Sequence, residues 1–505
     1  MAKDEKGTPN REERSVNHGN GKAQGDSQGT RLLRLLTDVE LFHTPDGEAY
    51  ATINVAGHRE NWPVRSSSFQ LWLSRLFYMS EKTALDTQSR QAALGVVEAQ
   101  AKFDGSELQV YNRVAEWKGN IYVDLGDPSW QVVEISSLGW SIVSNPPVRF
   151  IRSIGMRALP TPEHGGSISL LRPFVNLTDN DWILFVCWVI EAMWPRGPYP
   201  ILCLQGEQGT AKTTLARVAR LLLDPFKAPM RSIPHNERDL FISASNSHII
   251  SIDNISYLPP WFSDASSRLA TGGGLTTRRL WTDGEEHILE AQRPILLNGI
   301  NEIGVNSDFL DRSLVLSLPE ITEKERKDDD EFWAEFAKAS PLILGAFLNG
   351  VSAALRNYPT VKLERKPRMA GFAKLGSAVE TDLGFKAGEF IDAYNRNRKE
   401  ASHLALESSA VALQVYEFMK DKTEWEGTHL ELLRSLRPQE SGKGYPFPMS
   451  PKSLSNVLTR FKPNLRTAGI TIRSLPRKAV RRCIRLEKRP AAASPSSPPS
   501  PPSVD

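Results

Sequence analysis

One glycine-containing loop constrains this chain more than any other stretch. Residues 201–204 are apolar and predict a short buried strand, and a helical pattern begins near Lys212. The loop between them has the order of a phosphate-binding loop, G-x-x-x-x-G-K-[ST], which predicts a nucleotide site. The residues expected to bind the nucleotide are Gly206, Glu207, Gln208, Gly209, Thr210, Ala211, Lys212, Thr213 and Thr214.

The residue types of this loop suit phosphate chemistry. Gly206 and Gly209 let the backbone bend so that its N–H groups point at a phosphate. The positive end of the helix adds to this attraction, and the ammonium of Lys212 reaches the β- and γ-phosphates as a catalytic group. The hydroxyl of Thr213 is placed to bind Mg²⁺. ATP and Mg²⁺ are therefore the expected cofactors.

One position departs from the motif, because Ala211 stands where its second glycine is expected. We expect Ala211 to have helical backbone angles, where a methyl group costs little. The alternative interpretation of the whole loop is a plain glycine turn between a strand and a helix. Such a turn has no need of Lys-Thr at this spacing, so the nucleotide site is favoured.

Composition bounds the remaining possibilities. The chain has 505 residues, enough for several domains, and a net charge of only +3. Its three cysteines lack metal-ligand spacing, which predicts a reducing compartment without disulfides or zinc. The N-terminus has no apolar signal core, and the longest apolar stretch, 182–190, is too short to span a bilayer. We expect a cytoplasmic protein with no membrane partner.

The segment before the loop reads as an α+β domain, with a hairpin over 40–55, helices at 67–80 and 86–103, and short strands from 108 to 143. Asp124 and Asp127 suggest an acid pair for a metal, but the favoured interpretation is a strand end that opens a turn. A Thr178 cap is expected to begin the helix that leads into the nucleotide-binding domain.

A second nucleotide motif follows the loop. Residues 249–252 have strand character and end in Asp253, and an acid at the carboxyl edge of a parallel strand lies beside a phosphate loop. Asp253 is predicted to hold Mg²⁺; the alternative is a strand-end turn. Many such enzymes have a glutamate at the next position, whereas this chain has Asn254, whose amide orients water but takes no proton.

Three later features complete the predicted site. Asp283-Gly284 indicates a hairpin on which Arg278, Arg279 and Trp281 offer charge and stacking to single-stranded DNA. The alternative is a surface hairpin whose tryptophan packs inward.

A strand at 294–297 ends in Asn298, which is expected to face the γ-phosphate and position water. Arg312 precedes another strand and is predicted to be an arginine finger that reaches a neighbouring subunit's nucleotide. Its alternative role is a salt bridge with Asp308 or Asp311.

The order of these motifs over 178–320 resembles the superfamily 3 helicases, a branch of the AAA+ ATPases. It is most similar to the helicase parts of phage, plasmid and large-virus primase–helicases, and to prophage-encoded ATP-binding proteins. The resemblance implies a homohexameric ring with ATP between subunits, hairpins lining a central channel for single-stranded or forked DNA, and a separate primase or polymerase as a further partner. Ala211 and Asn254 depart from the family pattern.

The C-terminal part is predicted to bind DNA. The pattern is helical to about 420, and 421–489 reads as a small winged-helix domain. Glu487 is the only acid between 452 and 489, a density of positive charge that favours phosphate contacts over a generic basic tail. The residues expected to contact nucleic acid there are Arg477, Lys478, Arg481 and Arg482.

The fold class expected is multidomain α/β, with a P-loop AAA+ core built on a parallel sheet with flanking helices. The predicted segments are a disordered tail (1–30), an N-terminal α+β domain (31–175), the ATPase core (176–322), a helical subdomain (323–420), a basic winged-helix-like domain (421–489) and a disordered Pro/Ser tail (490–505).

Two functions remain open from the sequence. The first is an ATP-dependent DNA helicase or translocase acting in replication of a phage or other mobile element. The second is an ATP-switched DNA-binding initiator or regulator with slow hydrolysis. The hairpin and Arg312 favour the first, and Asn254 favours the second.

Overall fold

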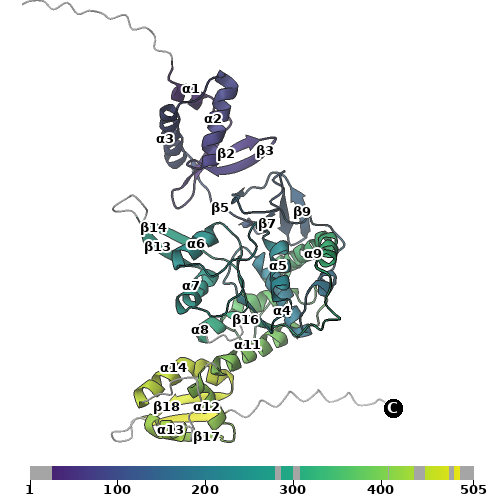
Figure 1. Ribbon diagram of the computed structural model, residues 1–505, viewed down its shortest axis with the longest axis vertical. Coiled ribbons are helices and arrows are strands. Elements are labelled where there is room, and N and C mark those ends of the chain that lie inside the picture. The colour runs from purple at the N-terminus through teal and green to yellow at the C-terminus, as the bar shows by residue number, and fades with distance from the viewer. Residues whose placement is uncertain are drawn as a thin grey trace, which may run out of the picture. The chain divides into compact units, whose positions relative to one another are not determined.

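The computed structural model describes residues 26–278, 286–299, 307–407, 409–436, 450–476 and 483–488. The chain divides into two compact units, Met1–Gln109 and Val110–Asp505. The division therefore falls inside the predicted 31–175 domain. Figure 1 labels the elements of both units. The predicted tail 490–505 lies outside the described residues, as does most of 1–30.

The first unit joins an antiparallel hairpin to two helices, as predicted. The strand order is β3-β2-β1-β4, with β4 parallel to β1. The sheet and the helices share one apolar core that includes Ile53, Phe69, Leu73 and Leu94. Its elements are α1 (Gln28–Arg34), β1 (Glu40–His43), β2 (Ala49–Val55), β3 (His58–Pro63), α2 (Ser67–Glu81), α3 (Thr87–Phe103) and β4 (Ser106–Glu107).

The second unit opens with a four-stranded antiparallel meander rather than with the end of the first domain. Val133, Ile135 and Trp140 of this meander pack in the same core as the helices that follow, which explains why the compact boundary falls before residue 110. The predicted strand 108–115 is broken in two. The elements are β5 (Val110–Tyr111), β6 (Val114–Trp117), β7 (Asn120–Asp124), β8 (Val132–Ser136), β9 (Gly139–Val143) and β10 (Arg149–Phe150).

The centre of this unit is a four-stranded sheet in the order β12-β15-β11-β16, and every neighbouring pair is parallel. The elements from its start to its last strand are η1 (Ile168–Phe174), α4 (Asp179–Ala192), β11 (Ile201–Gln205), α5 (Lys212–Leu223), α6 (Glu237–Ser245), β12 (Ile250–Ile252), α7 (Pro260–Thr271), β13 (Gly273–Arg278), β14 (Glu286–Ala291), β15 (Ile295–Asn298), α8 (Ser307–Leu310) and β16 (Ser313–Ser317).

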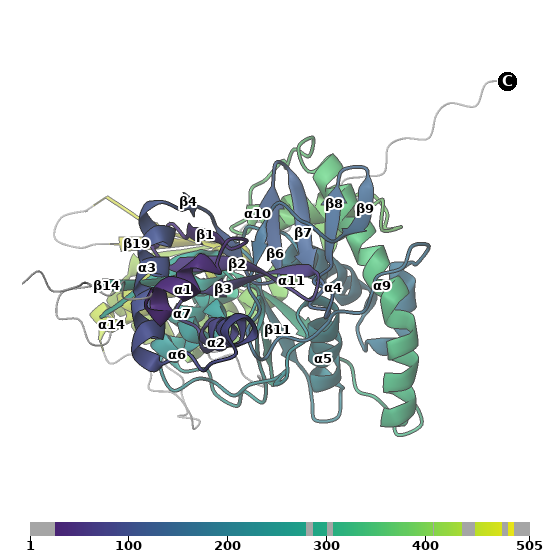
Figure 2. The same cartoon turned by 90° about the horizontal axis from the view of Figure 1, so that it is seen from above.

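Both faces of this sheet are buried, as expected for parallel strands. Leu202 and Leu204 point into one core with residues of α4 and α5. Ile201 and Cys203 point into a second core with α6 and α7. Figures 1 and 2 show α4 and α5 on one side of the sheet and α6 and α7 on the other. Every apolar residue of β11 therefore has a helix to pack against.

The helical segment predicted after the sheet consists of α9 (Asp329–Asn357), α10 (Ala370–Val379), α11 (Glu389–Glu407) and α12 (Ala410–Phe418). In the described part of the chain, α9 is long and apolar enough to cross a membrane, but 67% of that stretch is buried inside the protein, as in a core helix. From α11, the Asn397 side chain bonds both backbone groups of Val315 in the edge strand β16.

The last described region has its own apolar core, to which Leu432, Leu454, Leu458 and Leu486 contribute. Its sheet order is β17-β19-β18, and both pairs are antiparallel. The two helices and the sheet occur where the sequence predicted a small folded domain, and its winged-helix assignment stays a prediction. The elements are β17 (Glu424–Thr428), α13 (His429–Leu436), α14 (Pro451–Thr467), β18 (Ile470–Ser474) and β19 (Cys483–Lys488).

A buried carboxylate joins three separate segments of the second unit. Asp224, just after α5, accepts a bond from Arg113 Nε at 3.1 Å and from the backbone N–H groups of His248 and Ile249 at 2.9 and 3.2 Å. Arg220 lies 3.5 Å from the same carboxylate. Burial alone would raise the pKa of Asp224, but Arg113 and Arg220 outweigh it and hold that pKa below its usual value. The group is therefore ionised and fully enclosed.

Replacing this carboxylate is expected to be costly. Asp224→Ala leaves two buried guanidinium groups without a counter-charge, and we expect it to lower the free energy of unfolding by about 3–5 kcal/mol. Urea unfolding followed by tryptophan fluorescence measures this. Glu417→Ala removes an exposed pair with Lys420 and serves as the control, with an expected loss of less than about 1 kcal/mol. Equal losses in the two variants would contradict the assigned role.

Stability is also expected to depend on pH through His248. Burial, reinforced by Arg293, lowers the pKa of His248 to about 4. The unfolded chain takes up this proton below about 6.5, whereas the folded chain does not, so stability falls as the pH is lowered from about 6.5 to about 4. His248→Gln keeps a donor for the carbonyl of Ala192 and should flatten the fall by up to about 1.4 kcal/mol per pH unit. An unchanged slope would rule the assignment out.

Candidate nucleotide-binding site

The ends of three parallel strands bring the predicted site residues to one edge of the sheet. β11 leads into Gly206, β12 leads into Asp253, and β15 ends at Asn298. The strand register places Leu204 opposite Asn298 and Ile252 opposite Leu297. Ligands of such sheets bind outside the carboxyl ends of the strands. Residues 45 or more positions apart in the sequence therefore meet beside the loop.

Asn298 links these site residues by hydrogen bonds. Its Nδ2 donates to Thr213 Oγ1 at 3.1 Å and to Asp253 Oδ1 at 2.5 Å. The Thr213 hydroxyl lies 3.4 Å from the same Asp253 oxygen. Asn298 is only 1% exposed, and its Oδ1 has no hydrogen-bond partner among the described residues. A buried acceptor of this kind is normally satisfied by a water or a ligand donor.

The loop itself has the geometry that its glycines predicted. Gly206 and Gly209 have φ values of 147° and 89°, in the region that favours glycine. A side chain at Gly206 would come within 2.9 Å of the carbonyl oxygen of Leu318. Lys212 Nζ donates to the carbonyls of Gly206 at 2.8 Å and Glu207 at 2.6 Å. The lysine ammonium thus lies over the loop that the phosphates are predicted to enter.

The expectation for Ala211 was wrong. Its φ of 62° and ψ of 30° are left-handed, not helical, because this residue is the N-cap that turns the loop into α5. A non-glycine residue in this region carries a strain of about 1–2 kcal/mol. Ala211 also makes no side-chain cap hydrogen bond. The first N–H groups of α5 are consequently not used by a capping oxygen, which suits an anion.

A cavity of about 680 Å³ lies beside the loop, and the sequence did not reveal it. Loop residues line it together with residues before α4 and after β16. Asn176 Nδ2 holds these segments together by donating to the carbonyls of Pro319 at 2.7 Å and Thr210 at 3.3 Å. The lining residues outside the loop include Phe174, Asn176, Glu320, Ile321, Arg326, Lys327 and Phe332.

Aromatic and basic side chains dominate part of this cavity. The Phe174 and Phe332 rings meet edge to face at 5.5 Å, and Lys327 Nζ lies 5.8 Å from the Phe174 ring. Arg326 Nη2 lies 3.0 Å from where a side chain on Gly209 would begin. The charged run 323–330, at the start of the predicted helical subdomain, therefore supplies side chains next to the loop. The mixture of acidic and basic residues in this run forms no motif that predicts a position beside the loop.

The side chains of Asn254 and Arg312 are not brought into the Asn298 cluster. Asn254 is exposed with a φ of 57°, and its backbone N–H donates to Asp253 Oδ1 at 2.8 Å. Arg312 pairs with Asp308, which was its alternative role, and Arg368 approaches the same carboxylate at 2.7 Å. No contact among the described residues joins Arg312 to residues 206–214.

The N-terminal acid pair has a structural role. The Asp124 carboxylate is buried, pairs with Arg152 at 2.6 Å and accepts from the N–H of Gly126. Asp127 caps the turn that follows it. Over the described ranges, no cluster of three or more His, Cys, Asp or Glu side chains has the arrangement to hold a metal ion. The favoured interpretation of this pair as a strand end and turn is confirmed.

Most of the residues predicted to bind nucleic acid lie outside the part of the chain that the structure describes. Arg278 ends β13, paired in register with Glu286 of β14, and this confirms the antiparallel strands of the hairpin, whose predicted turn at Asp283-Gly284 lies outside the described residues. The remaining members of the set lie outside the described residues: Arg279, Trp281, Arg477, Lys478, Arg481 and Arg482.

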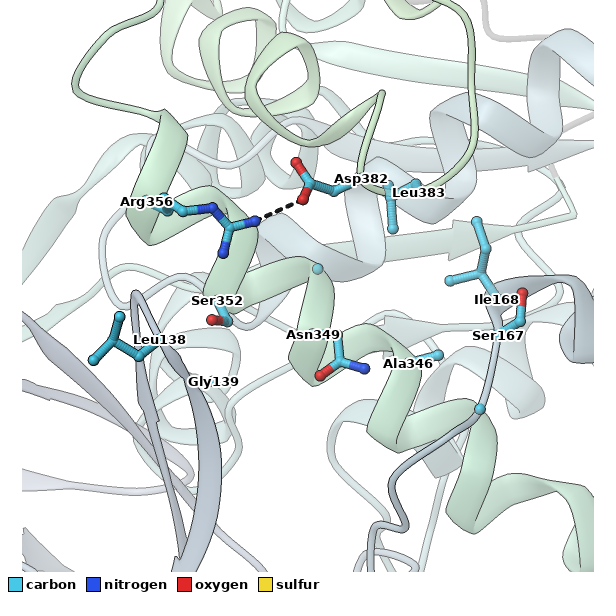
Figure 3. A pocket seen from close by; sticks show the side chains of 12 residues that line it. Leu138, Gly139, Ser167, Ile168, Ala346, Asn349, Ser352, Arg356, Asp382 and Leu383 are labelled. Atoms are coloured by element: carbon cyan, nitrogen blue, oxygen red, sulfur yellow. Dashed lines mark hydrogen bonds and ion pairs between the residues drawn. The ribbon is translucent and has the colours of Figure 1, made fainter.

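A second cavity, of about 300 Å³, contains none of the predicted site residues (Figure 3). Arg356 and Asp382 form an ion pair at 2.6 Å across it, as the dashed line shows. Asn349 accepts a bond from Trp140 Nε1 at 3.0 Å. These contacts join α9 to β9 and to the loop after α10. They explain how the meander is held on the helical segment and do not suggest a ligand.

The strain at Ala211 gives a direct prediction. Ala211→Gly removes the left-handed penalty but adds freedom to the unfolded chain, so we expect a net gain of about 0.5–1 kcal/mol in unfolding free energy. Thermal and urea unfolding measure it. Ala216→Gly, within the buried and helical part of α5, is the matched control and is expected to destabilise by about 1 kcal/mol or more. Destabilisation by both variants would show that Ala211 is not strained.

Two regions of the chain match models of known protein families. Residues 168–399 match the family model described as actinomycete integrative conjugative element replication protein, and residues 411–499 match the model of its C-terminal domain. No curated protein matches the chain.

Two solved structures resemble the chain distantly. The structure titled "SCCmec type IV Cch - active helicase" has 12% identity and a TM-score of 0.49, covering 89% of this chain and 93% of that one. An apo structure of the NrS-1 C-terminal region has 11% identity and a TM-score of 0.41, covering 90% and 98%. In the two regions matched by the family models, which together span more than half of the chain, this sequence is similar to the replication protein of actinomycete integrative conjugative elements.

Proposed function

We propose that the protein is an ATP-dependent DNA helicase or translocase acting in the replication of a mobile element. The observation that carries this proposal is the convergence of Thr213, Asp253 and Asn298 beside a glycine loop with Lys212 over it. The similarity to a replication protein of conjugative elements supports the biological setting. DNA as the partner follows from that setting and from the basic C-terminal region.

ATP binding would use groups that are already in place. The phosphates replace the carbonyls of Gly206 and Glu207 as acceptors for Lys212, and the first N–H groups of α5 face them. The oxygens of Thr213 and Asp253 are of the type that Mg²⁺ prefers, and the unsatisfied Oδ1 of Asn298 can accept from a bound water. When bound, Mg²⁺ neutralises charge on the β- and γ-phosphates.

We assign the nucleoside to the cavity beside the loop. The Phe174 and Phe332 rings provide an apolar wall. Asn176 holds the segment that leads into α4 by donating to the carbonyl of Pro319. A cavity of about 680 Å³ is within the usual size for a small-molecule site. Arg326 and Lys327 add positive charge on the side of Gly209.

Hydrolysis would then depend on an orienting amide rather than on a strong base. Asn298 lies where it can position a water, and Asn254 contributes no proton acceptor. In a homohexamer, Arg312 would leave Asp308 and reach the nucleotide of the next subunit. Movement of the β13–β14 hairpin along single-stranded or forked DNA would follow each turnover.

A second candidate function is an ATP-switched DNA-binding initiator or regulator. Asn254 favours it, because the residue after Asp253 carries no carboxylate and is exposed. Binding of ATP would then change conformation, with hydrolysis slow or absent.

ATP hydrolysis with and without single-stranded DNA tests the proposal. We expect DNA to stimulate turnover and Lys212→Ala to lower it by about 10²-fold or more, since a charge that stabilises the transition state is lost. Lys227→Ala removes an exposed lysine after α5 and is the control, with turnover expected to be unchanged.

The other outcomes separate the two candidates. ATP binding with negligible turnover, with or without DNA, would sink the motor and support the switch. Failure of the wild-type protein to bind ATP would overturn the nucleotide site itself.

A further inference from the structure

We propose that the exposed face of α14, with the cavity next to it, binds duplex DNA and discriminates among its sequences. This inference rests on the proposed function only in taking DNA as the partner, because its surface lies in the C-terminal region and contains no residue of the nucleotide site. The exposed face of α14 is defined here by Lys452, Ser455, Asn456, Thr459, Arg460, Lys462 and Arg466.

The two sides of α14 differ sharply. Leu454, Leu458, Phe461 and Leu465 are buried in the core of this region and fix the helix in place. The opposite side is polar, and all its members except the partly buried Ser455 are exposed. A helix held in this way presents a rigid row of side chains, and its diameter of about 10–12 Å suits the major groove of B-DNA.

Positive charge is available on the exposed face of this helix. Residues 450–476 contain no aspartate or glutamate. Lys452, Lys462 and Arg466 make no ion pair with any acidic side chain that the structure describes.

By contrast, Arg473 of β18 pairs with Glu487 at 3.3 Å, and Arg485 of β19 pairs with Glu424 and Glu426 at 3.0 Å each. Lys452, Lys462 and Arg466 of the helix are therefore available to contact phosphates.

The polar residues between these cations provide a means of reading bases. Asn456 carries an amide and Ser455 a hydroxyl, the groups that bond base edges in the major groove. The Thr459 hydroxyl donates to the carbonyl of Ser455 at 2.8 Å and can still accept a hydrogen bond. Single-strand binders instead expose aromatic rings for stacking. The aromatic residue of α14, Phe461, is buried at 5% exposure. The chemistry of this face thus fits a duplex better than a single strand.

A cavity of about 550 Å³ borders the same face. Ser455, Thr459 and Lys462 line it from α14, and Ser474 and Cys483 line it from the facing ends of β18 and β19. Lysine and hydroxyl groups are among those that contact the phosphates beside a base-reading helix, and this cavity is lined by both. The cavity therefore extends the surface toward the strand ends.

Selection of duplexes from a random pool by the full-length protein tests the sequence preference. Fluorescence anisotropy then compares the selected duplex with a shuffled duplex and with one of its single strands, over a range of salt. We expect the selected duplex to bind at least about tenfold more tightly than the shuffled one, as a few base contacts provide.

Substitutions separate charge from base reading. Lys462→Ala and Arg466→Ala should each weaken all duplexes alike and reduce the slope of log K against log salt by about 1. Asn456→Ala should reduce the preference for the selected sequence and leave the slope unchanged. Arg473→Ala, exposed but paired with Glu487, is the matched control and should change neither quantity.

Three results would overturn the inference: no sequence enriched, the single strand bound more tightly than the duplex, or no effect of the α14 substitutions in variants with unchanged thermal unfolding. Lys212→Ala distinguishes this inference from the proposed function. We expect this variant to lose turnover and to retain the duplex preference. If the wild type lacks turnover but retains the duplex preference, the motor fails and the duplex surface stands.

Discussion

Parallel pairing of β15 between β11 and β12 is the constraint on which the rest of this molecule depends. It sets Asn298 level with Leu204, one strand away from the residue that leads into Asp253. The same pairing requires both faces of the sheet to be covered, which explains the helices on each side. The loop, Asp253 and Asn298 thus come together because of the backbone hydrogen bonds between the strands that lead into them.

The sequence was informative wherever a signal is local. The apolar runs, the Thr178 cap and the hairpin turns predicted most of the helices and strands near their observed positions. The residues of the loop were predicted to be a nucleotide site from spacing alone, and their roles stay predictions. Ala211 was misjudged because the reversal of chain direction before α5 is a property of the whole loop rather than of one residue type.

What the sequence could not give are contacts between distant segments. The cavity beside the loop joins Phe174 and Asn176 to Arg326 and Phe332, and neither segment has a motif. The Asp224 cluster gathers two arginines and two backbone N–H groups from separate segments, and no spacing rule predicts it. The domain boundary was misplaced for the same reason, since the meander is bound to α9 by packing across more than two hundred residues.

The contact between Asn397 and Val315 has a consequence for how copies of this chain can associate. The Asn397 amide occupies both backbone groups of Val315 that an added strand would otherwise bond. A strand from another copy therefore cannot pair with β16 at that point. Strand exchange, a common route from a monomer to an aggregate, is closed on this side. An assembly formed on this side must then be built from helices and loops, whose contacts can break and form again without unravelling the fold.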